Sequence, residues 1–382
     1  MKKILQIALL MMLSVTFLHA MPAPTSPVSK ASSSFGVTLC GAEFGQNNLP
    51  GILNTHYIYP TQNEVDYFAN KGVQIIQLPI RWERIQRTLG GPLDARELSL
   101  IEKFLDDCAA RNIQVTLIMQ NYGRYKINNV EYIIGSPQVS RANYKDVWRK
   151  LATALRNRKN IYAFSIMSEP NHMQNYSWFE SAQQAINGIR EVDRTHTILV
   201  DGDNYSGPET WVEYNDQLKY LVDPANNMMF NAHCYFDEDR SGEYKKSYAA
   251  SGSNEMTGVE RIKHFVDWLH ANNKRGFVGE FGIPNNDNRW MVVLDNFLQY
   301  LTENNIGGCY WAAGRWWKNY PLSIEPMGST DKPQMNLYAK YLVQTNKSQF
   351  AKSAVAKNTR KSNSDTYNYE YAANTKSYSA LK

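Results

Sequence analysis

Between residue 34 and about residue 344, short apolar runs alternate with longer stretches in which apolar residues recur every three or four positions. The short runs are continuous and rich in β-branched and aromatic residues, which is typical of strands buried on both faces of a parallel sheet. The longer stretches have the period of amphipathic helices. Eight runs predict strands, at 36–43, 73–80, 114–120, 161–168, 197–201, 228–236, 276–280 and 307–312.

A helix-like stretch follows each of the eight predicted strands. Asp94 and Asn288 precede two of these stretches and Gly258 opens a third, and such residues favour helix starts. Parallel strands need crossover connections of this kind. Eight repeats of strand and helix predict one α/β domain, a (β/α)8 TIM barrel, over residues 35–344.

An open, doubly wound sheet is the alternative with the same alternation. It would normally carry a glycine-rich phosphate-binding loop after the first strand, and the stretch from Gly41 to Gly45 lacks that form. No repeat with a fixed short period is present, which disfavours a solenoid.

The two ends of the chain differ from the body. Residues 1–20 combine Lys2 and Lys3 with an apolar segment and a final Ala20, the pattern of a secretory signal peptide. Residues 21–34 are rich in Pro, Ser and Ala and predict a flexible linker. We therefore expect a secreted protein, extracellular or, from a bacterial source, periplasmic, with no membrane association after signal removal.

The excess of positive charge is confined to the ends. The whole chain has a formal net charge of +5, yet residues 345–382 contain seven Lys or Arg against two acids, and residues 21–344 carry a net charge of −2. The tail therefore predicts a basic, disordered extension. The body lacks the electrostatics of a nucleic-acid-binding domain, and we expect a monomer.

The cysteines leave their pairing open. Cys40, Cys108, Cys234 and Cys309 would allow three pairings if all were bridged, but small buried thiols are the ordinary explanation for cysteines in barrel strands. No spacing of Cys and His resembles a structural zinc site, so no metal is predicted.

Two glutamates stand at the ends of predicted strands. Glu169 and Glu280 each end an apolar run, and Pro170 and the Phe281–Gly282 pair follow them. In a (β/α)8 barrel the carboxyl ends of the strands form the catalytic face, so both side chains are expected there. Paired carboxylates across a sugar ring are what glycoside hydrolysis requires.

Other strand ends add polar and aromatic candidates. Arg81 follows the second strand, and an arginine in this position often pairs with a carboxylate. His233 and Tyr235 lie on one face of the sixth strand because side chains alternate. Trp311, near the end of the eighth strand, is a candidate for stacking on a sugar.

These pieces together resemble the secreted endoglucanases of glycoside hydrolase family 5. The resemblance runs from Gly41 to the region of Trp311 and rests on the order and placement of short motifs. They are Pro79-Ile80-Arg81-Trp82, Asn121-Tyr122-Gly123-Arg124-Tyr125, Met167-Ser168-Glu169-Pro170, His233-Cys234-Tyr235 and Gly279-Glu280-Phe281-Gly282, with Asp203 to Gly207 and Trp211 resembling the family's fifth loop.

The resemblance implies hydrolysis with retention of configuration. Glu280 would be the nucleophile and Glu169 the acid and then the base. Arg81 would keep Glu280 ionised, His233 would bond to Glu169, and Tyr235 would lie near Glu280. Two carboxylates and water suffice for this reaction, so no cofactor is expected.

Two positions depart from the family pattern. The residue before the acid is usually Asn, which binds the sugar 2-hydroxyl, and here it is Ser168. The third strand usually ends in His-Asn, and here it ends in Gln120-Asn121. Gln can donate and accept as His does, but Ser is two heavy atoms shorter than Asn.

The substrate predicted from these features is a cellulose-like β-glucan. Ser168 departs from the family pattern at the position that binds the sugar 2-hydroxyl, so a mannanase or another β-glycanase is an alternative. A noncatalytic carbohydrate-binding pseudoenzyme is a third possibility, against which the presence of both glutamates argues. The further candidates for substrate contacts are aromatic residues that suit flat sugar faces: Tyr122, Trp178, Trp211 and Trp316.

Overall fold

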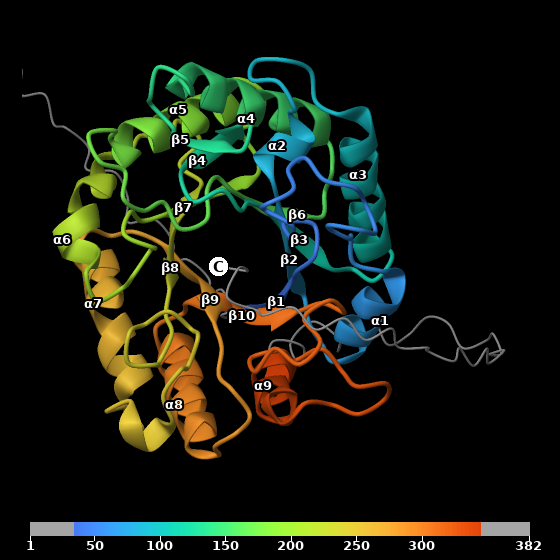
Figure 1. Cartoon of the computed structure of the whole chain (residues 1–382). Coiled ribbons are helices and arrows are strands. Elements are labelled where there is room, and N and C mark those ends of the chain that lie inside the picture. Colours follow the sequence, from blue (N-terminus) through green and yellow to red (C-terminus); the bar gives the residue numbers. More distant parts are fainter. Residues whose placement is uncertain (1–33, 345–382) are drawn as a thin grey trace, which may run out of the picture. The chain divides into compact units, whose positions relative to one another are not determined.

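A computed structural model describes residues 34–344, and they form the predicted TIM barrel. Eight parallel strands close in the order β1-β10-β9-β8-β7-β6-β3-β2 (Figure 1). The predicted signal peptide, most of the linker and the tail lie outside the described residues. The barrel strands are β1 (Phe35–Leu39), β2 (Ile75–Ile80), β3 (Gln114–Met119), β6 (Ile161–Ser165), β7 (Thr197–Asp201), β8 (Met228–His233), β9 (Gly276–Phe281) and β10 (Gly307–Ala313).

Helices surround the barrel, with at least one after each strand (Figure 1). Asp94 begins α3 as expected, because its Oδ1 accepts hydrogen bonds from the amides of Arg96 and Glu97, each at 3.0 Å. The helices are α1 (Gln62–Asn70), α2 (Trp82–Ile85), α3 (Ala95–Ala109), α4 (Arg141–Leu155), α5 (Trp178–Arg190), α6 (Trp211–Asn215), α7 (Thr257–Ala271), α8 (Arg289–Glu303) and α9 (Pro333–Gln344), with short 3-10 turns at Asp216–Tyr220 and Tyr248–Ala250.

A hairpin that the apolar pattern did not predict lies between β3 and α4. Its antiparallel strands are β4 (Arg124–Ile127) and β5 (Val130–Ile133). Asn128 and Asn129 form the tight turn, with φ values of 51° and 63°. Asparagine tolerates this left-handed conformation, and such turns join hairpin strands.

Three barrel strands end three or four residues earlier than predicted, and β3 ends one residue earlier. The predicted strands reach residues 43, 168 and 236, whereas β1 ends at Leu39, β6 at Ser165 and β8 at His233. The apolar runs continue because the following residues remain buried after the chain has left the sheet. Site residues therefore lie on irregular segments just beyond the strands.

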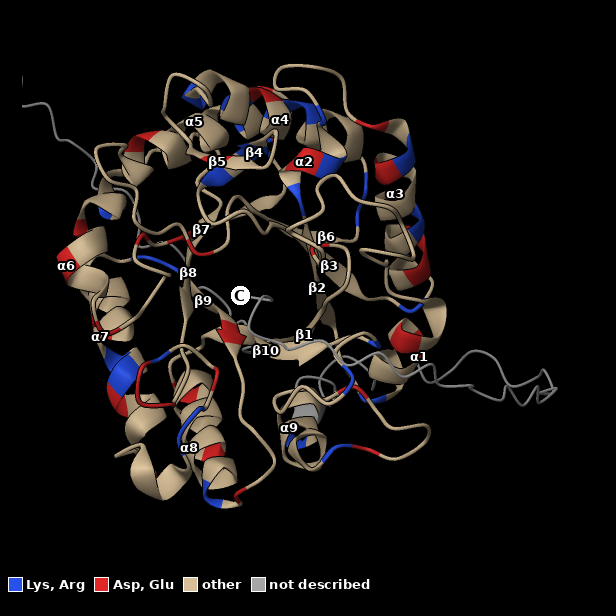
Figure 2. Cartoon of the chain, viewed as in Figure 1, with Lys and Arg blue, Asp and Glu red and all other residues tan. Residues whose placement is uncertain are grey.

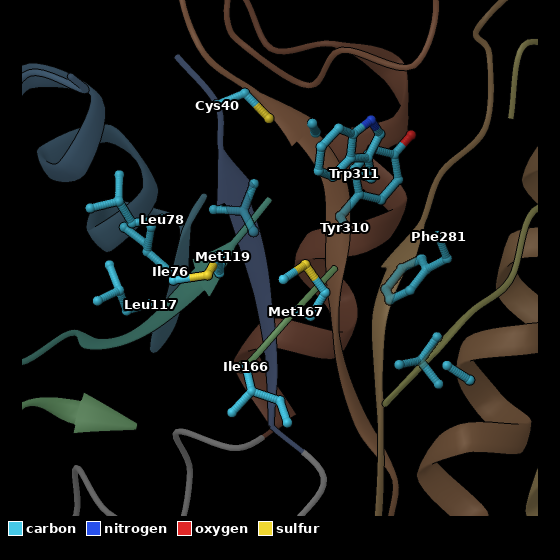
Figure 3. Packing of buried hydrophobic residues seen from close by; sticks show 14 of the residues in the cluster. Cys40, Ile76, Leu78, Leu117, Met119, Ile166, Met167, Phe281, Tyr310 and Trp311 are labelled. Carbon is cyan, nitrogen blue, oxygen red and sulfur yellow. The ribbon is translucent and has the colours of Figure 1, made fainter. Parts of the chain in front are cut away.

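Buried side chains fill the barrel and the layer beneath the helices. One residue from each of six strands forms a small cluster, as expected for inward-facing positions: Ile75, Ala163, Leu199, Met229, Phe277 and Cys309. The larger cluster includes Ile76 and Leu78 on β2, Leu117 and Met119 on β3, and Phe281, Tyr310 and Trp311 from β9 and β10 (Figure 3).

All four cysteines are buried free thiols, so the structure contains none of the pairings left open by the sequence. Within residues 34–344, no helix has both the length and the apolar character needed to span a membrane. Charged residues of both signs are interspersed along the outer helices (Figure 2).

Candidate active site

The two glutamates meet at the carboxyl-terminal end of the barrel. Glu169 follows β6 and Glu280 is the penultimate residue of β9. One carboxylate oxygen from each, together with a ring nitrogen of His233, lie within 4.8 Å of one another. Glu169 has a φ of 47°, an uncommon backbone conformation for a residue other than glycine. The strand ends therefore bring together two carboxylates that are 111 residues apart.

His233 lies between these carboxylates. Its Nδ1 is 2.9 Å from Oε1 of Glu169 and 3.4 Å from Oε1 of Glu280. The side chain of His233 is only 4% exposed, and that of Glu169 is 14% exposed. The imidazole is thus fixed against both glutamates, while Glu169 keeps an opening to solvent.

Asp201 supports the other side of the imidazole. Its Oδ2 lies 3.2 Å from Nε2 of His233 and accepts a hydrogen bond of the same length from the backbone N–H of Glu169. Asn231 donates from Nδ2 to Oδ1 of Asp201 at 2.7 Å. A Cβ at Gly279 would come within 2.6 Å of Asn231, so the glycine before Glu280 lets this amide pack closely. We did not select Asp201 as a site residue from the sequence, although it ends a predicted strand.

This arrangement keeps His233 protonated. Burial alone would lower the pKa of His233, but Glu280, Asp201 and Glu169 overcome that effect and raise it to about 9. Burial raises the pKa of Asp201 to about 6, so it is mainly ionised at neutral pH.

Tyr235 contacts the second glutamate. Its hydroxyl donates to Oε2 of Glu280 at 2.7 Å. Burial, with the charge of Glu280, raises the pKa of Tyr235 well above its ordinary value, so the phenol remains a neutral donor. This contact orients the carboxylate on the side away from His233.

Arg81, expected to keep Glu280 ionised, makes hydrogen bonds with the loop after β1. The guanidinium donates from Nε to the backbone oxygen of Glu43 at 2.9 Å and from Nη2 to Oε1 of Gln46 at 3.1 Å. It also lies 5.5 Å from the ring centroid of Tyr122. These contacts pull Arg81 toward the loop after β1, where it fixes the wall of the site.

A cleft of about 750 Å³ opens beside the glutamates. Glu169, His233 and Tyr235 line it together with Tyr122 and Arg81. Most of the remaining wall comes from polar residues of the loops after β1, β3, β7 and β8, including Gln46, Asn47, Asn121, Arg124, Lys126, Asn204, Tyr205, Glu209, Asp239, Arg240 and Glu243. A polar cleft of this size suits a hydroxyl-rich ligand.

Trp311 lies in a smaller recess that shares part of this wall. Gln120, Tyr122 and Arg81 line the recess with it, as does Trp317, which we did not select from the sequence. Trp317 stacks on Tyr320 with their ring centroids 4.2 Å apart. The adjacent pair Trp316-Trp317 made both tryptophans candidates for the site, but only Trp316 was predicted.

The residues that depart from the family pattern are both buried. Oγ of Ser168 and Oε1 of Gln120 have no hydrogen-bond partner within the described part of the chain. Nε2 of Gln120 lies 3.4 Å from the hydroxyl of Tyr122. Asn121 is already engaged, because it accepts from the amide of Trp82 at 2.8 Å and donates to Glu83 at 2.8 Å. Asn121 therefore holds the loops around the site.

Two of the proposed sugar platforms, Trp178 and Trp211, are wrong because their side chains are buried. Trp178 is buried and donates from Nε1 to the backbone oxygen of Asp201 at 2.7 Å, and Trp211 is fully buried against Phe265. Trp316 is half-buried against the core and does not line the cleft. Trp178 and Trp211 belong to the packing between helices and strands.

Tyr205 is an aromatic side chain of the cleft that we missed. It is 45% exposed and lines the cleft, and its hydroxyl lies 3.4 Å from Nδ1 of His172. Tyr205 lies within the stretch that resembles the family's fifth loop, so its position was available from the sequence. Tyr122 and Tyr205 are thus the aromatic residues best placed to meet a ligand.

The chain matches a family model. Residues 37–316 match the model of the cellulases, glycosyl hydrolase family 5. Among curated proteins, the chain is 32% identical over 311 residues to endo-beta-1,4-glucanase B of Emericella nidulans, with 80% of this chain and 90% of that protein covered.

Solved structures resemble it over the same region. Endoglucanase Cel5A of Pseudomonas stutzeri, in complex with cellobiose, is 37% identical with a TM-score of 0.77, and the match covers 81% of this chain and 92% of that one. XacCel5A in complex with cellopentaose is 36% identical with a TM-score of 0.76, over 81% and 99% of the two chains.

Proposed function

The chain belongs to glycosyl hydrolase family 5 and is a glycoside hydrolase of the endo-1,4-β-glucanase type, and on this premise we propose that it cleaves cellulose-like β-glucans with retention of configuration. Glu280 is the nucleophile and Glu169 the acid and base. The observation that carries this proposal is that one carboxylate oxygen of Glu169 lies within 4.8 Å of one carboxylate oxygen of Glu280. Retaining enzymes place their two carboxyl groups about 5–5.5 Å apart, whereas inverting enzymes leave room for a water between carboxyl groups roughly 6.5–9.5 Å apart.

The first step transfers the glycone to the enzyme. A carboxylate oxygen of Glu280 bonds to the anomeric carbon while the glycosidic bond breaks, and Glu169 gives its proton to the departing oxygen. Tyr235 donates to Glu280 at 2.7 Å and holds that carboxylate in one orientation. His233 donates to Glu169 and supplies positive charge between the two carboxylates.

The second step releases the sugar. Glu169, now ionised, takes a proton from water, and the resulting hydroxide oxygen bonds to the anomeric carbon as the bond to Glu280 breaks. Two inversions give net retention. Because the proton moves from Glu169 to the leaving group and returns from water, the enzyme ends in its starting state.

The relatives that were solved with cellobiose and cellopentaose support a glucan substrate. A mannanase or another β-glycanase is the second candidate, favoured by the short Ser168 with its unpartnered Oγ. Reducing-sugar release from carboxymethylcellulose, mannan and xylan separates the two. We expect the highest rate on carboxymethylcellulose, and a higher rate on mannan or xylan would contradict the glucan assignment.

Two variants test the catalytic assignment in the same assay. Glu280→Ala should abolish hydrolysis, while Glu213→Ala, which removes an exposed glutamate of α6, should leave it unchanged. Hydrolysis at the wild-type rate by Glu280→Ala would refute the mechanism.

We also propose that the protein is exported, on the strength of residues 1–20. Amino-terminal sequencing of protein recovered from outside the cytoplasm should begin after Ala20. Recovery of the uncleaved chain in the cytoplasm alone would contradict export.

A further inference from the structure

A second pocket lies at the end of the barrel opposite the two glutamates. It has a volume of about 480 Å³. Gln114, Ile161 and Thr197 line it, and they are the first residues of β3, β6 and β7, whereas the catalytic candidates lie at the carboxyl ends of strands. The pocket is therefore separate from the cleft.

Unpaired cations gather around this pocket. Arg156 and Lys159 line it, Arg194 precedes the lining residue Thr195, and Lys274 and Arg275 precede β9 on the same side of the barrel. We call these five residues the basal patch. None of them forms an ion pair within residues 34–344, and all except the half-buried Lys274 are exposed.

Several acidic groups of this end are engaged by cations outside the basal patch. Arg158 pairs with Asp106 and lies 3.9 Å from Glu102. The buried Asp193 is bonded to His196, and Asp223 pairs with Arg190 through Nε at 2.6 Å. The basal patch therefore presents positive charge beside carboxylates that are engaged by other cations, apart from the exposed Glu303 at the end of α8, which forms no ion pair within residues 34–344.

Hydrogen bonds connect the loops that carry the patch. Asn227 donates to the backbone oxygen of Thr195 at 2.9 Å and accepts from Nη1 of Arg275 at 3.1 Å. Nη2 of Arg194 donates to the backbone oxygen of Pro224 at 3.1 Å. His196 bonds through Nε2 to the backbone oxygen of Arg158 at 2.9 Å. The charges are thus held on a preorganised surface, which lowers the entropy lost on binding.

The last described helix ends on this side of the barrel. The last described helix, α9, follows β10 and so runs back toward the basal end of the barrel, where it ends at Gln344. Residues 345–382, which follow, contain seven Lys or Arg and two acidic residues.

We propose that the basal patch binds an acidic polysaccharide, a chain of uronate sugars, while the cleft at the other end stays open to its substrate. Guanidinium and ammonium groups suit carboxylates. Gln114, Asn157, Thr195 and Thr197 supply neutral polar groups for hydroxyls in the same pocket.

The composition of the surface favours a hydrated polymer over a lipid surface. Membrane-binding surfaces insert large apolar side chains beside their cations. No exposed large apolar side chain occurs within the described segments 111–114, 156–162, 194–197 and 272–276, whereas Tyr220 and Val222 are exposed at the adjoining loop before β8. A membrane partner is therefore an outcome that the test must be able to reveal.

The test measures binding of the full mature chain to polygalacturonate by affinity electrophoresis. Arg156→Gln, Lys159→Gln and Arg275→Gln combined should weaken binding about tenfold or more, and added salt should weaken wild-type binding. The matched control combines Arg96→Gln, Lys318→Gln and Lys332→Gln, which remove the same charge from the catalytic end of the barrel.

Equal loss in both triple variants would overturn the proposal, because net charge alone would then explain binding. Stronger binding to vesicles containing phosphatidylserine or to duplex DNA than to polygalacturonate would also overturn it. Both triple variants should hydrolyse an uncharged soluble cellobioside at the wild-type rate, which shows that they are folded and keeps this test independent of the catalytic assignment.

Discussion

Nε2 of His233 lies 3.2 Å from Oδ2 of Asp201, a carboxylate that does not reach the cleft itself. Through this contact a third acidic residue acts on the pair of glutamates, because the opposite ring nitrogen of His233 bonds to Glu169. Asp201 is fully buried and also accepts the backbone N–H of Glu169. Asp201 is therefore a positioning residue that fixes both the charge and the orientation of His233.

Asp201→Asn should shift the pH dependence of hydrolysis. Losing this carboxylate removes one of the charges that raise the pKa of His233 to about 9, so His233 will lose its proton at lower pH. The alkaline limb of the kcat/KM profile on a soluble cellobioside should move down by about one pH unit. Asn231, whose Oδ1 has no partner in the described residues, can turn its amide to accommodate the new side chain.

Asp203→Asn is the matched control for this profile. Asp203 lies two residues away and contacts neither His233 nor Glu169, since its carboxylate bonds to the amide of Asn204. The control should keep the wild-type profile. An alkaline limb in Asp201→Asn that stays in place or moves to higher pH would refute the role of Asp201.

Ser168→Asn should raise turnover on cellulosic substrate about tenfold. Asparagine at this position would contact the sugar 2-hydroxyl, and such contacts strengthen in the transition state by several kcal/mol at most. Initial rates on carboxymethylcellulose measure the effect, with Ser168→Ala as the control that should match wild type because Oγ of Ser168 has no partner within residues 34–344. A fall in turnover would show that the site is built for another sugar.

Glu325→Gln should stabilise the protein at pH 8 but not at pH 4.5. Burial, with the charge of Glu64, raises the pKa of Glu325 to about 8, and its Oε2 accepts from the amide of Gly314 at 2.9 Å. Between pH 4.5 and 8 the folded state binds a proton that the unfolded state has lost, so stability falls as pH rises. The glutamine keeps an acceptor without this titration, and Tm at pH 8 should rise by about 3 °C or more.

Glu303→Gln provides the comparison, because Glu303 is an exposed glutamate at the end of α8. The Tm of the Glu303→Gln variant should equal that of the wild-type protein at both pH 4.5 and pH 8. A Glu325→Gln variant with the same Tm gain at pH 4.5 as at pH 8 would show that titration of Glu325 is not responsible.

The barrel was predictable because its signal is repeated. Eight apolar runs separated by helical periods leave few other arrangements, and Thr197–Asp201 has the bounds that the pattern predicted. The hairpin β4–β5 was missed since its short strands are partly exposed and carry no apolar run. Its Asn128-Asn129 turn was the available signal.

The strand-end rule located the glutamates, His233 and Tyr235, because position on a parallel strand determines position on the catalytic face. It failed for Trp178 and Trp211, whose identity suggests either a sugar platform or a core residue, and burial alone decides between them. The partners of Arg81 come from the loop after β1, whose course no periodic pattern determines.

Mass spectrometry of the trapped glycosyl-enzyme tests the assignment of Glu169 and Glu280 most directly. The enzyme is incubated with a 2-deoxy-2-fluoro-β-cellobioside that has a good leaving group, since fluorine at C2 slows the second step and lets the covalent intermediate accumulate. We predict a single added fluorocellobiosyl group on the peptide that contains Glu280. A label on Glu169 or on any other residue would contradict the account.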